Sequence, residues 1–159
     1  AADVLFWVAM AMIAGFIILG TAAERLHRLG ISVLTTAVSG MGLFMLVQLL
    51  IVCHTDSWIM PLWLAFGFFG TSGILTYATL SQSFPVQLSG RVTTAVNLLV
   101  FVAAFIGQWA IGAIIDLWPA GDNGTFSDLG IKTGFAMMLG LQGIALIWFI
   151  VASKRFHKE

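Results

Sequence analysis

Charged residues are scarce in this chain. They make up 9% of its 159 residues, while hydrophobic residues make up 60%. A soluble domain carries roughly 25% charged residues, because water has to solvate its surface. A chain with so few charges needs a second, apolar solvent, and lipid provides one. The low charge content therefore excludes an ordinary soluble domain and indicates an integral membrane protein.

The chain also lacks cysteine pairs and any excess of charge of one sign. Cys53 is the single cysteine, which excludes an internal disulfide and a metal site built from several cysteines. The seven basic and seven acidic residues balance, so nothing favours nucleic acid as a partner. The sequence shows no metal-ligand cluster, phosphate-binding loop or paired carboxylates. We therefore expect no cofactor and no bound metal.

Long apolar runs are abundant, and each is long enough to cross a bilayer. A spanning helix needs about 20 mostly apolar residues. Pro85 and Pro119 end two of the runs, as proline does at the end of a helix. We predict an all-α fold, a polytopic membrane helix bundle in a single transmembrane domain over residues 1–159. Its five transmembrane helices are expected at residues 3–23, 31–53, 57–83, 91–118 and 132–154.

The basic residues are unevenly distributed between the two ends of these spans. When five spans alternate in direction, six of the seven basic residues fall on one side: Arg25, Arg28, Arg91, Lys154, Arg155 and Lys158. Lys132 is the single basic residue on the other side. The side richer in Lys and Arg faces the cytoplasm. We therefore expect the N-terminus outside and the C-terminus in the cytoplasm, in the inner (plasma) membrane of a bacterium.

Hydroxyl side chains form a stripe on the third predicted span. The stripe has spacings of four, three and four residues, which places its members on one helical face: Ser72, Thr76, Thr79 and Ser83. Tyr77 lies beside it. Positions that face lipid are apolar, so a polar stripe indicates a face turned toward protein or water. The alternative is that these hydroxyls bond to carbonyls of their own helix.

Two amides form a similar stripe on the fourth predicted span. Asn97 and Gln108 are 11 residues apart, which is close to three helical turns, so they share a face. Two neighbouring spans with polar stripes suggest one surface lined by water or by a solute. We predict that Thr76, Tyr77, Asn97 and Gln108 line it. The alternative is that the amides join helices together by hydrogen bonds.

Two short motifs resemble those of a known family. Gly20-Thr21-Ala22-Ala23-Glu24-Arg25 resembles the start of the Gly-x-x-x-Asp-Arg loop of the major facilitator superfamily, with Glu24 in place of Asp and without the usual Gly-Arg-Lys ending. Phe84-Pro85 through Gly90-Arg91, and on through Val92–Asp116, resembles the family's loop between spans ten and eleven and span eleven itself. The resemblance implies that the five helices are spans eight to twelve of a twelve-helix transporter.

That resemblance implies a partner and roles for particular residues. The partner is the missing N-terminal half of the transporter, and a chain that opens on Ala-Ala rather than Met fits a part of a larger protein. Loops of this kind latch one transport state in the family, which points to Gly20, Glu24, Arg25 and Arg91. Gly20 would allow close helix approach, and Glu24 would meet a helix N-terminus of the other half. The alternative is that the arginines only anchor the loops at the lipid headgroups.

The function that these features favour is secondary transport of a small solute by alternating access. In the family the tenth and eleventh spans line the central cavity, which are the two spans that have polar stripes here. A neutral lining of hydroxyls and amides favours an uncharged or zwitterionic solute. The main alternative, from another class, is a non-transporting membrane subunit that scaffolds a complex.

A protease is a remote third hypothesis. Gly70-Thr71-Ser72-Gly73 matches the Gly-x-Ser-Gly of intramembrane serine proteases. That chemistry needs a base within hydrogen-bond reach of the serine. All three histidines lie at helix ends or in loops, far from Ser72 along the span. We therefore expect that the protein is not an enzyme.

Overall fold

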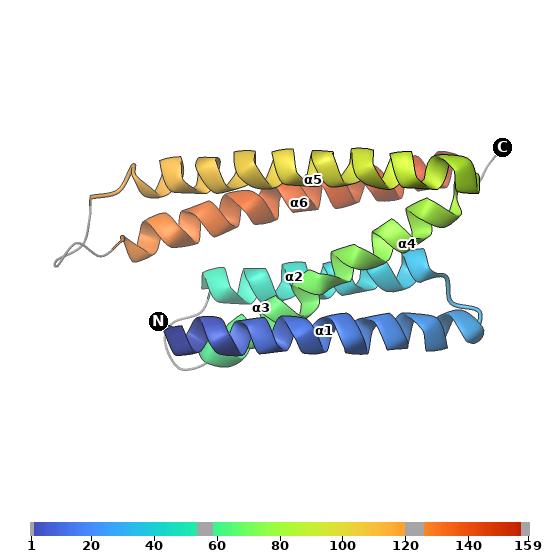
Figure 1. The fold of residues 1–159 in the computed structure, drawn as a ribbon. Helices are drawn as coiled ribbons and strands as arrows, with labels where there is room; N and C mark the ends of the chain where they lie inside the picture. The colour runs from blue at the N-terminus through green and yellow to red at the C-terminus, as the bar shows by residue number, and fades with distance from the viewer. Residues whose placement is uncertain (1, 54–58, 120–125, 157–159) are drawn as a thin grey trace. The chain divides into compact units, whose positions relative to one another are not determined.

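The fold is all-helical over the residues that the computed structural model describes, which are 2–53, 59–119 and 126–156. These residues form six α-helices and one short 3₁₀ segment (Figure 1): α1 (Ala2–Arg28), α2 (Val33–Cys53), α3 (Ile59–Gly70), η1 (Thr71–Gly73), α4 (Ile74–Gln82), α5 (Val86–Ile115) and α6 (Asp128–Phe156). With α3, η1 and α4 counted as one span, five stretches are long and apolar enough to cross a membrane. This confirms the predicted all-α membrane bundle of five spanning helices.

The first helix is longer than predicted. It continues past residue 23 to Arg28. Its last turns include Glu24 and Arg28, whose side chains form an i,i+4 ion pair at 2.6 Å. Such a pair supports the helix, and basic residues near a helix C-terminus favour its dipole. The motif that resembles a loop is therefore part of a helix here.

Gly30 ends that helix. It has a φ of +89°, a conformation that glycine adopts without strain. Its N–H donates to the carbonyl of His27 at 3.0 Å, and the N–H of Ile31 donates to that of Leu26 at 3.0 Å. These two bonds form a Schellman motif, which satisfies carbonyls that a helix end would leave free. The connection to α2 is consequently short.

Two further helices begin earlier than predicted. α5 starts at Val86, directly after Pro85, rather than at residue 91. The carbonyl of Pro85 accepts hydrogen bonds from the N–H groups of the first turn, so proline begins this helix as well as ending the previous one. α6 starts at Asp128 rather than residue 132, with an ion pair of 3.3 Å between Asp128 and Lys132 across its first turn.

The third span is broken, where a continuous helix was predicted. Between α3 and α4, residues Thr71–Gly73 form the 3₁₀ segment η1. The N–H of Ile74 bonds to the carbonyl of Thr71, three residues back instead of four. A glycine stands on each side of Thr71 and Ser72, and glycine has a low helix propensity. The break therefore occurs where the chain prefers an α-helix least.

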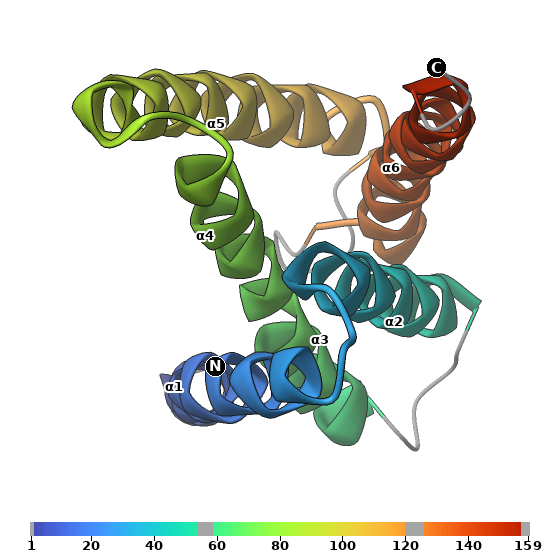
Figure 2. The same cartoon turned by 90° about the vertical axis from the view of Figure 1, so that its right-hand side faces the viewer.

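The chain up to Ala103 forms one compact unit, in which α3 packs against both α1 and α2 (Figure 2). Glycines provide the closest contacts. A Cβ built on Gly15 of α1 would lie 2.5 Å from the carbonyl oxygen of Phe68, and one built on Gly67 would lie 2.9 Å from that of Val8. Helices in lipid associate by such close packing of small residues, because burial of apolar area drives little there.

α2 contacts the broken part of the span in the same way. A Cβ on Gly40 would lie 2.6 Å from the Cβ of Ser72, which is 2% exposed. Toward α4, the buried side chains are again small or medium-sized: Ala23, Ala37 and Leu75 form one cluster. Small residues on α1 and α2 therefore fix the place of the third span.

The chain from Ala104 onward forms a second compact unit, made of the rest of α5 together with α6. A Cβ on Gly130 would lie 3.2 Å from the carbonyl oxygen of Ile115, and one on Gly134 would lie 3.2 Å from Ile111. As the residue number rises on α6 it falls on α5, so the two helices are antiparallel. No residue of α5 is buried by the chain itself.

We expect Gly40→Ala to lower the stability of the protein by about 1–3 kcal/mol, which is typical of overpacking. The added methyl would overlap Ser72. Gly42→Ala is a matched control in the same helix, because nothing lies within 4 Å of its Cβ position. Its thermal midpoint should equal or exceed that of the wild type, since alanine favours helix. The thermal midpoint is measured on the protein in detergent, as the temperature at which half of the monodisperse protein is lost.

A second substitution tests whether the contact itself is responsible. Ser72→Gly removes the Cβ that the new methyl would meet, so it should restore much of the stability lost in Gly40→Ala. Equal midpoints for Gly40→Ala and Gly42→Ala would contradict the close packing of α2 against η1.

Candidate functional site

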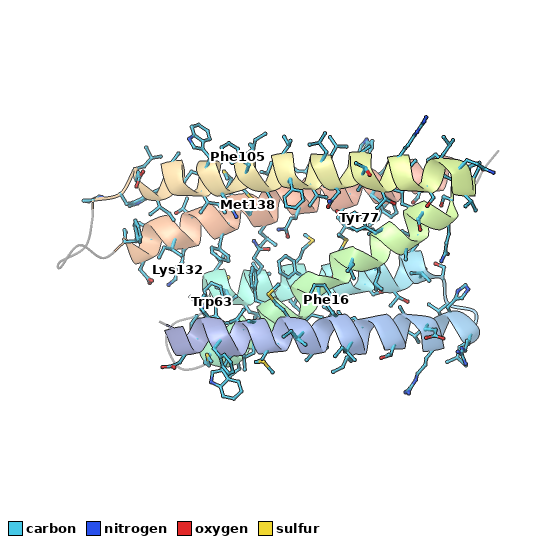
Figure 3. All side chains as sticks on the ribbon, viewed as in Figure 1. Phe16, Trp63, Tyr77, Phe105, Lys132 and Met138 are labelled. Atoms are coloured by element: carbon cyan, nitrogen blue, oxygen red, sulfur yellow. The ribbon has the colours of Figure 1, made fainter. Side chains whose placement is uncertain are left out.

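Two of the predicted site residues contact one another. The hydroxyl of Tyr77 on α4 donates a hydrogen bond to Oδ1 of Asn97 on α5 at 3.3 Å. Figure 3 shows the position of Tyr77 on α4. The two residues are 20 positions apart in the chain, so the bond joins two different helices. Its length exceeds the usual 2.5–3.0 Å of an O–H···O bond, which makes it weak and easy to open.

The surroundings of Asn97 are apolar and open. Asn97 is exposed, and the next residues along α5 are exposed apolar side chains, with Leu98 at 64% and Leu99 at 67%. An amide on a spanning helix is costly when it faces lipid. The face of α5 that contains Asn97 is therefore expected to face water or another protein. The bond from Tyr77 uses Oδ1 of this amide, so its N–H₂ group can donate to a ligand.

Gln108 is also exposed, but it belongs to the second compact unit. Its neighbours Phe105 and Trp109 are 73% and 69% exposed, so it too is an amide on an otherwise apolar helix surface. Its place on the same face as Asn97 stays a prediction from their spacing on α5.

Thr76 and the hydroxyl stripe are engaged with their own helix. The hydroxyl of Thr76 donates to the carbonyl of Gly73 at 2.6 Å. Thr79 and Ser83 likewise donate to carbonyls four residues back, at 3.2 and 2.8 Å. This favours the alternative given above for the stripe. Thr76 can still accept a hydrogen bond through its oxygen, but its proton is already used.

Ser72, the serine of the protease-like motif, occupies a packing position. It lies in η1 with its Cβ against Gly40 and is 2% exposed. Sequence reasoning placed Ser72 on the polar stripe and did not predict this packing role for it. The glycines at 70 and 73 are the signal of close packing and helix bending in the sequence, and their protease-like pattern was set aside because no base lies near Ser72.

The residues predicted to form a conformational latch lie at or near the ends of helices. Glu24 pairs with Arg28, and the two side chains are 65% and 76% exposed. An exposed i,i+4 pair contributes only about 0.3–0.5 kcal/mol, so Glu24 can exchange partners readily. Arg25 and Arg91 are exposed, and a Cβ on Gly20 would meet nothing within 4 Å. The latch role of these four residues stays a prediction.

One buried amide oxygen has no hydrogen-bond partner among the residues that the structure describes. It is Oε1 of Gln142, a half-buried residue of α6. The described residues also contain no group of three or more His, Cys, Asp or Glu side chains close enough to hold a metal ion. The chemistry that this site offers is therefore hydrogen bonding by neutral groups. No family model, curated protein or solved structure matches the chain.

We expect a measurable coupling between Tyr77 and Asn97. Interhelical hydrogen bonds in membranes contribute about 0.6 kcal/mol on average. Tyr77→Phe should therefore lower stability by roughly that amount, and Asn97→Leu should remove most of the effect of Tyr77→Phe. A double-mutant cycle of thermal or denaturant unfolding measures this term.

Thr94→Val provides the matched control for that cycle. Thr94 lies on α5 close to Asn97, but its hydroxyl bonds to Gly90 of its own helix at 2.9 Å. Tyr77→Phe should have its full effect in the Thr94→Val background. Additive effects of Tyr77→Phe and Asn97→Leu would show that the two residues do not interact.

Proposed function

We propose that this chain is the C-terminal part of a secondary transporter of the major facilitator type, which moves a small solute by alternating access. In this proposal the spans are the eighth to twelfth of the transporter, and its N-terminal half completes the solute pathway. The observation that supports it best is the Tyr77–Asn97 pair, a weak hydrogen bond between two spanning helices beside an exposed amide.

The pair has the properties that a solute-binding site needs. It offers neutral donors and acceptors, and its long hydrogen bond can be exchanged for bonds to a ligand. Asn97 and Gln108 are the leading binding residues, Tyr77 positions the amide of Asn97, and Thr76 contributes an acceptor. Because these groups are uncharged, the proposed solute is a small uncharged or zwitterionic molecule that forms several hydrogen bonds.

The proposal includes a direction in the membrane. The basic residues Arg25, Arg28 and Arg91 lie at the ends of α1 and α5 that the positive-inside rule places in the cytoplasm. The N-terminus is then outside and the C-terminus inside, in a bacterial inner membrane. Arg25 and Arg91, with Gly20 and Glu24, are proposed to contact the other half of the transporter in one of its two states.

Cysteine accessibility tests the proposed solute surface. In a Cys53→Ser background, Asn97→Cys and Gln108→Cys should react with small aqueous thiol reagents in intact membranes. Leu99→Cys and Ile106→Cys are matched controls. Leu99 lies two residues after Asn97 and Ile106 two residues before Gln108, so each control lies about 200° around the helix from the position it is compared with. Both controls are exposed apolar positions that should face lipid and stay unreactive. Silence at both 97 and 108 would instead favour a scaffold whose helices are sealed by another subunit.

Transport by the full-length protein tests the function directly. Once a solute is found, Asn97→Ala and Gln108→Ala should each raise the half-saturation concentration at least several-fold, because each removes a hydrogen-bonding group from the site. Wild-type kinetics in both variants at normal expression would refute the site assignment.

The orientation has its own test. Leu29→Cys and Phe126→Cys place a thiol in each of two connections, at positions 79% and 71% exposed. In the Cys53→Ser background, a membrane-impermeant maleimide added to intact cells should label position 126, and should label position 29 only after permeabilisation. The reverse pattern would invert the proposed orientation.

A further inference from the structure

We propose that Phe101 on α5 is a binding residue of the solute surface, and that the solute is a ring which lies flat on its phenyl group while its edge bonds to Asn97. This assignment rests on the proposed function and adds to it the class of solute. That class is an uncharged ring with apolar faces and hydrogen-bonding groups around its edge, as in a pyranose sugar or a heteroaromatic base.

Phe101 lies one helical turn beyond Asn97 on the same face of α5, within the first compact unit. Four residues turn an α-helix by about 400°, so the two side chains are about 40° apart around the axis, with their Cβ atoms about 5–6 Å apart. Long side chains on a helix point back toward its N-terminus, which directs the Phe101 ring toward the turn that contains Asn97. The ring is 66% exposed, and the amide is exposed too. A phenyl face and an amide therefore lie side by side on α5.

The amide distinguishes Phe101 from the exposed phenylalanines that face lipid. A polar side chain on a spanning helix is costly in lipid, so the face of α5 that Asn97 and Phe101 share is expected to turn toward water or protein. Leu99 lies two residues before Phe101, about 160° away around the helix, and is an exposed apolar position. The lipid-facing side of this turn is therefore accounted for without Phe101.

These two groups together select the shape of the solute. A phenyl face is a poor partner for hydroxyls, so a polar group that a solute buries against it loses its bonds to water without replacement. C–H groups or an aromatic face gain from the same contact. The bond from Tyr77 uses Oδ1 of Asn97, so the N–H₂ group of that amide donates to the edge of the solute. A ring with its polar groups on the edge meets both requirements, whereas an open chain with a hydroxyl on every carbon does not.

The charge of the solute follows from the composition of this helix. Residues 92–115 include no Asp, Glu, Lys or Arg. A cation that stacked on the Phe101 ring would give up part of its hydration without a carboxylate on this helix to replace it. The surface therefore fits an uncharged ring better than a charged one.

Stabilisation of the full-length protein by ligands tests the class of solute. Glucose and uracil are the ring probes, and sorbitol is an open chain with as many carbons as glucose. We expect glucose or uracil to raise the thermal midpoint in detergent at a concentration at which sorbitol does not. Phe101→Leu should weaken the binding of that ring about fivefold or more, whereas Phe101→Tyr keeps an aromatic face and should bind it within about twofold of the wild type. Phe149→Leu, the same change at an exposed position of α6, should leave binding unchanged.

The outcomes of this test are distinct. Stabilisation by glucose identifies a sugar site and stabilisation by uracil a site for planar heteroaromatic rings, and either result supports the proposal. Stabilisation by neither ring, equal stabilisation by sorbitol, or a ring affinity that Phe101→Leu does not change would overturn it.

Thiol reactivity separates this inference from the proposed function. In the Cys53→Ser background, Phe101→Cys should react with small aqueous thiol reagents at a rate similar to that of Asn97→Cys, while Leu99→Cys stays unreactive. Reaction at 97 with silence at 101 would overturn the placement of Phe101 and leave the proposed function standing. Silence at 97, 101 and 108 would overturn both.

Discussion

Close contact between the backbones of α1, α2 and the third span is the constraint on which the first unit depends. At Gly15, Gly40 and Gly67 a single added carbon would come within 2.9 Å of a neighbouring helix. Lipid solvates a leucine as well as another leucine does, so large apolar side chains give these helices little reason to associate. The absence of side chains at three positions allows the contacts that hold the helices together.

This constraint explains why polar groups are found where they are. The third span is tightly held up to η1, and its small polar residues are buried there, with Thr71 at 4% and Ser72 at 2% exposure. Beyond η1, Leu75 packs in a buried cluster with Ala23 and Ala37, and Tyr77 reaches the exposed amide of Asn97 on α5. The buried polar residues of the third span and its hydrogen bond to the next span therefore occupy different halves of the third span.

The sequence predicted much of this architecture because the bilayer imposes simple requirements. Apolar runs of about 20 residues locate all five spans. The ends were less accurate, because apolar content does not reveal local signals such as the Schellman motif at Gly30 or the helix start at Pro85. The 3₁₀ break was missed for a related reason. Glycine and threonine at 70, 71 and 73 are compatible with a continuous spanning helix, and the contacts of Gly15 and Gly40 with this segment depend on tertiary structure. Tyr77 and Asn97, two residues of the predicted surface, contact one another, while their role in binding stays a prediction; periodicity could not show that Thr76 bonds to its own backbone.

The 3₁₀ segment also changes the angular relation between the two ends of its span. An α-helix turns about 100° per residue and a 3₁₀ helix about 120°. Three residues of η1 therefore advance every later side chain by about 60° beyond the place that a regular helical wheel assigns. Tyr77 meets Asn97 with this extra twist included. If this span were aligned with an unbroken α-helix, every residue would be paired with the right counterpart. The side chains after Gly73 would nevertheless be assigned the wrong direction.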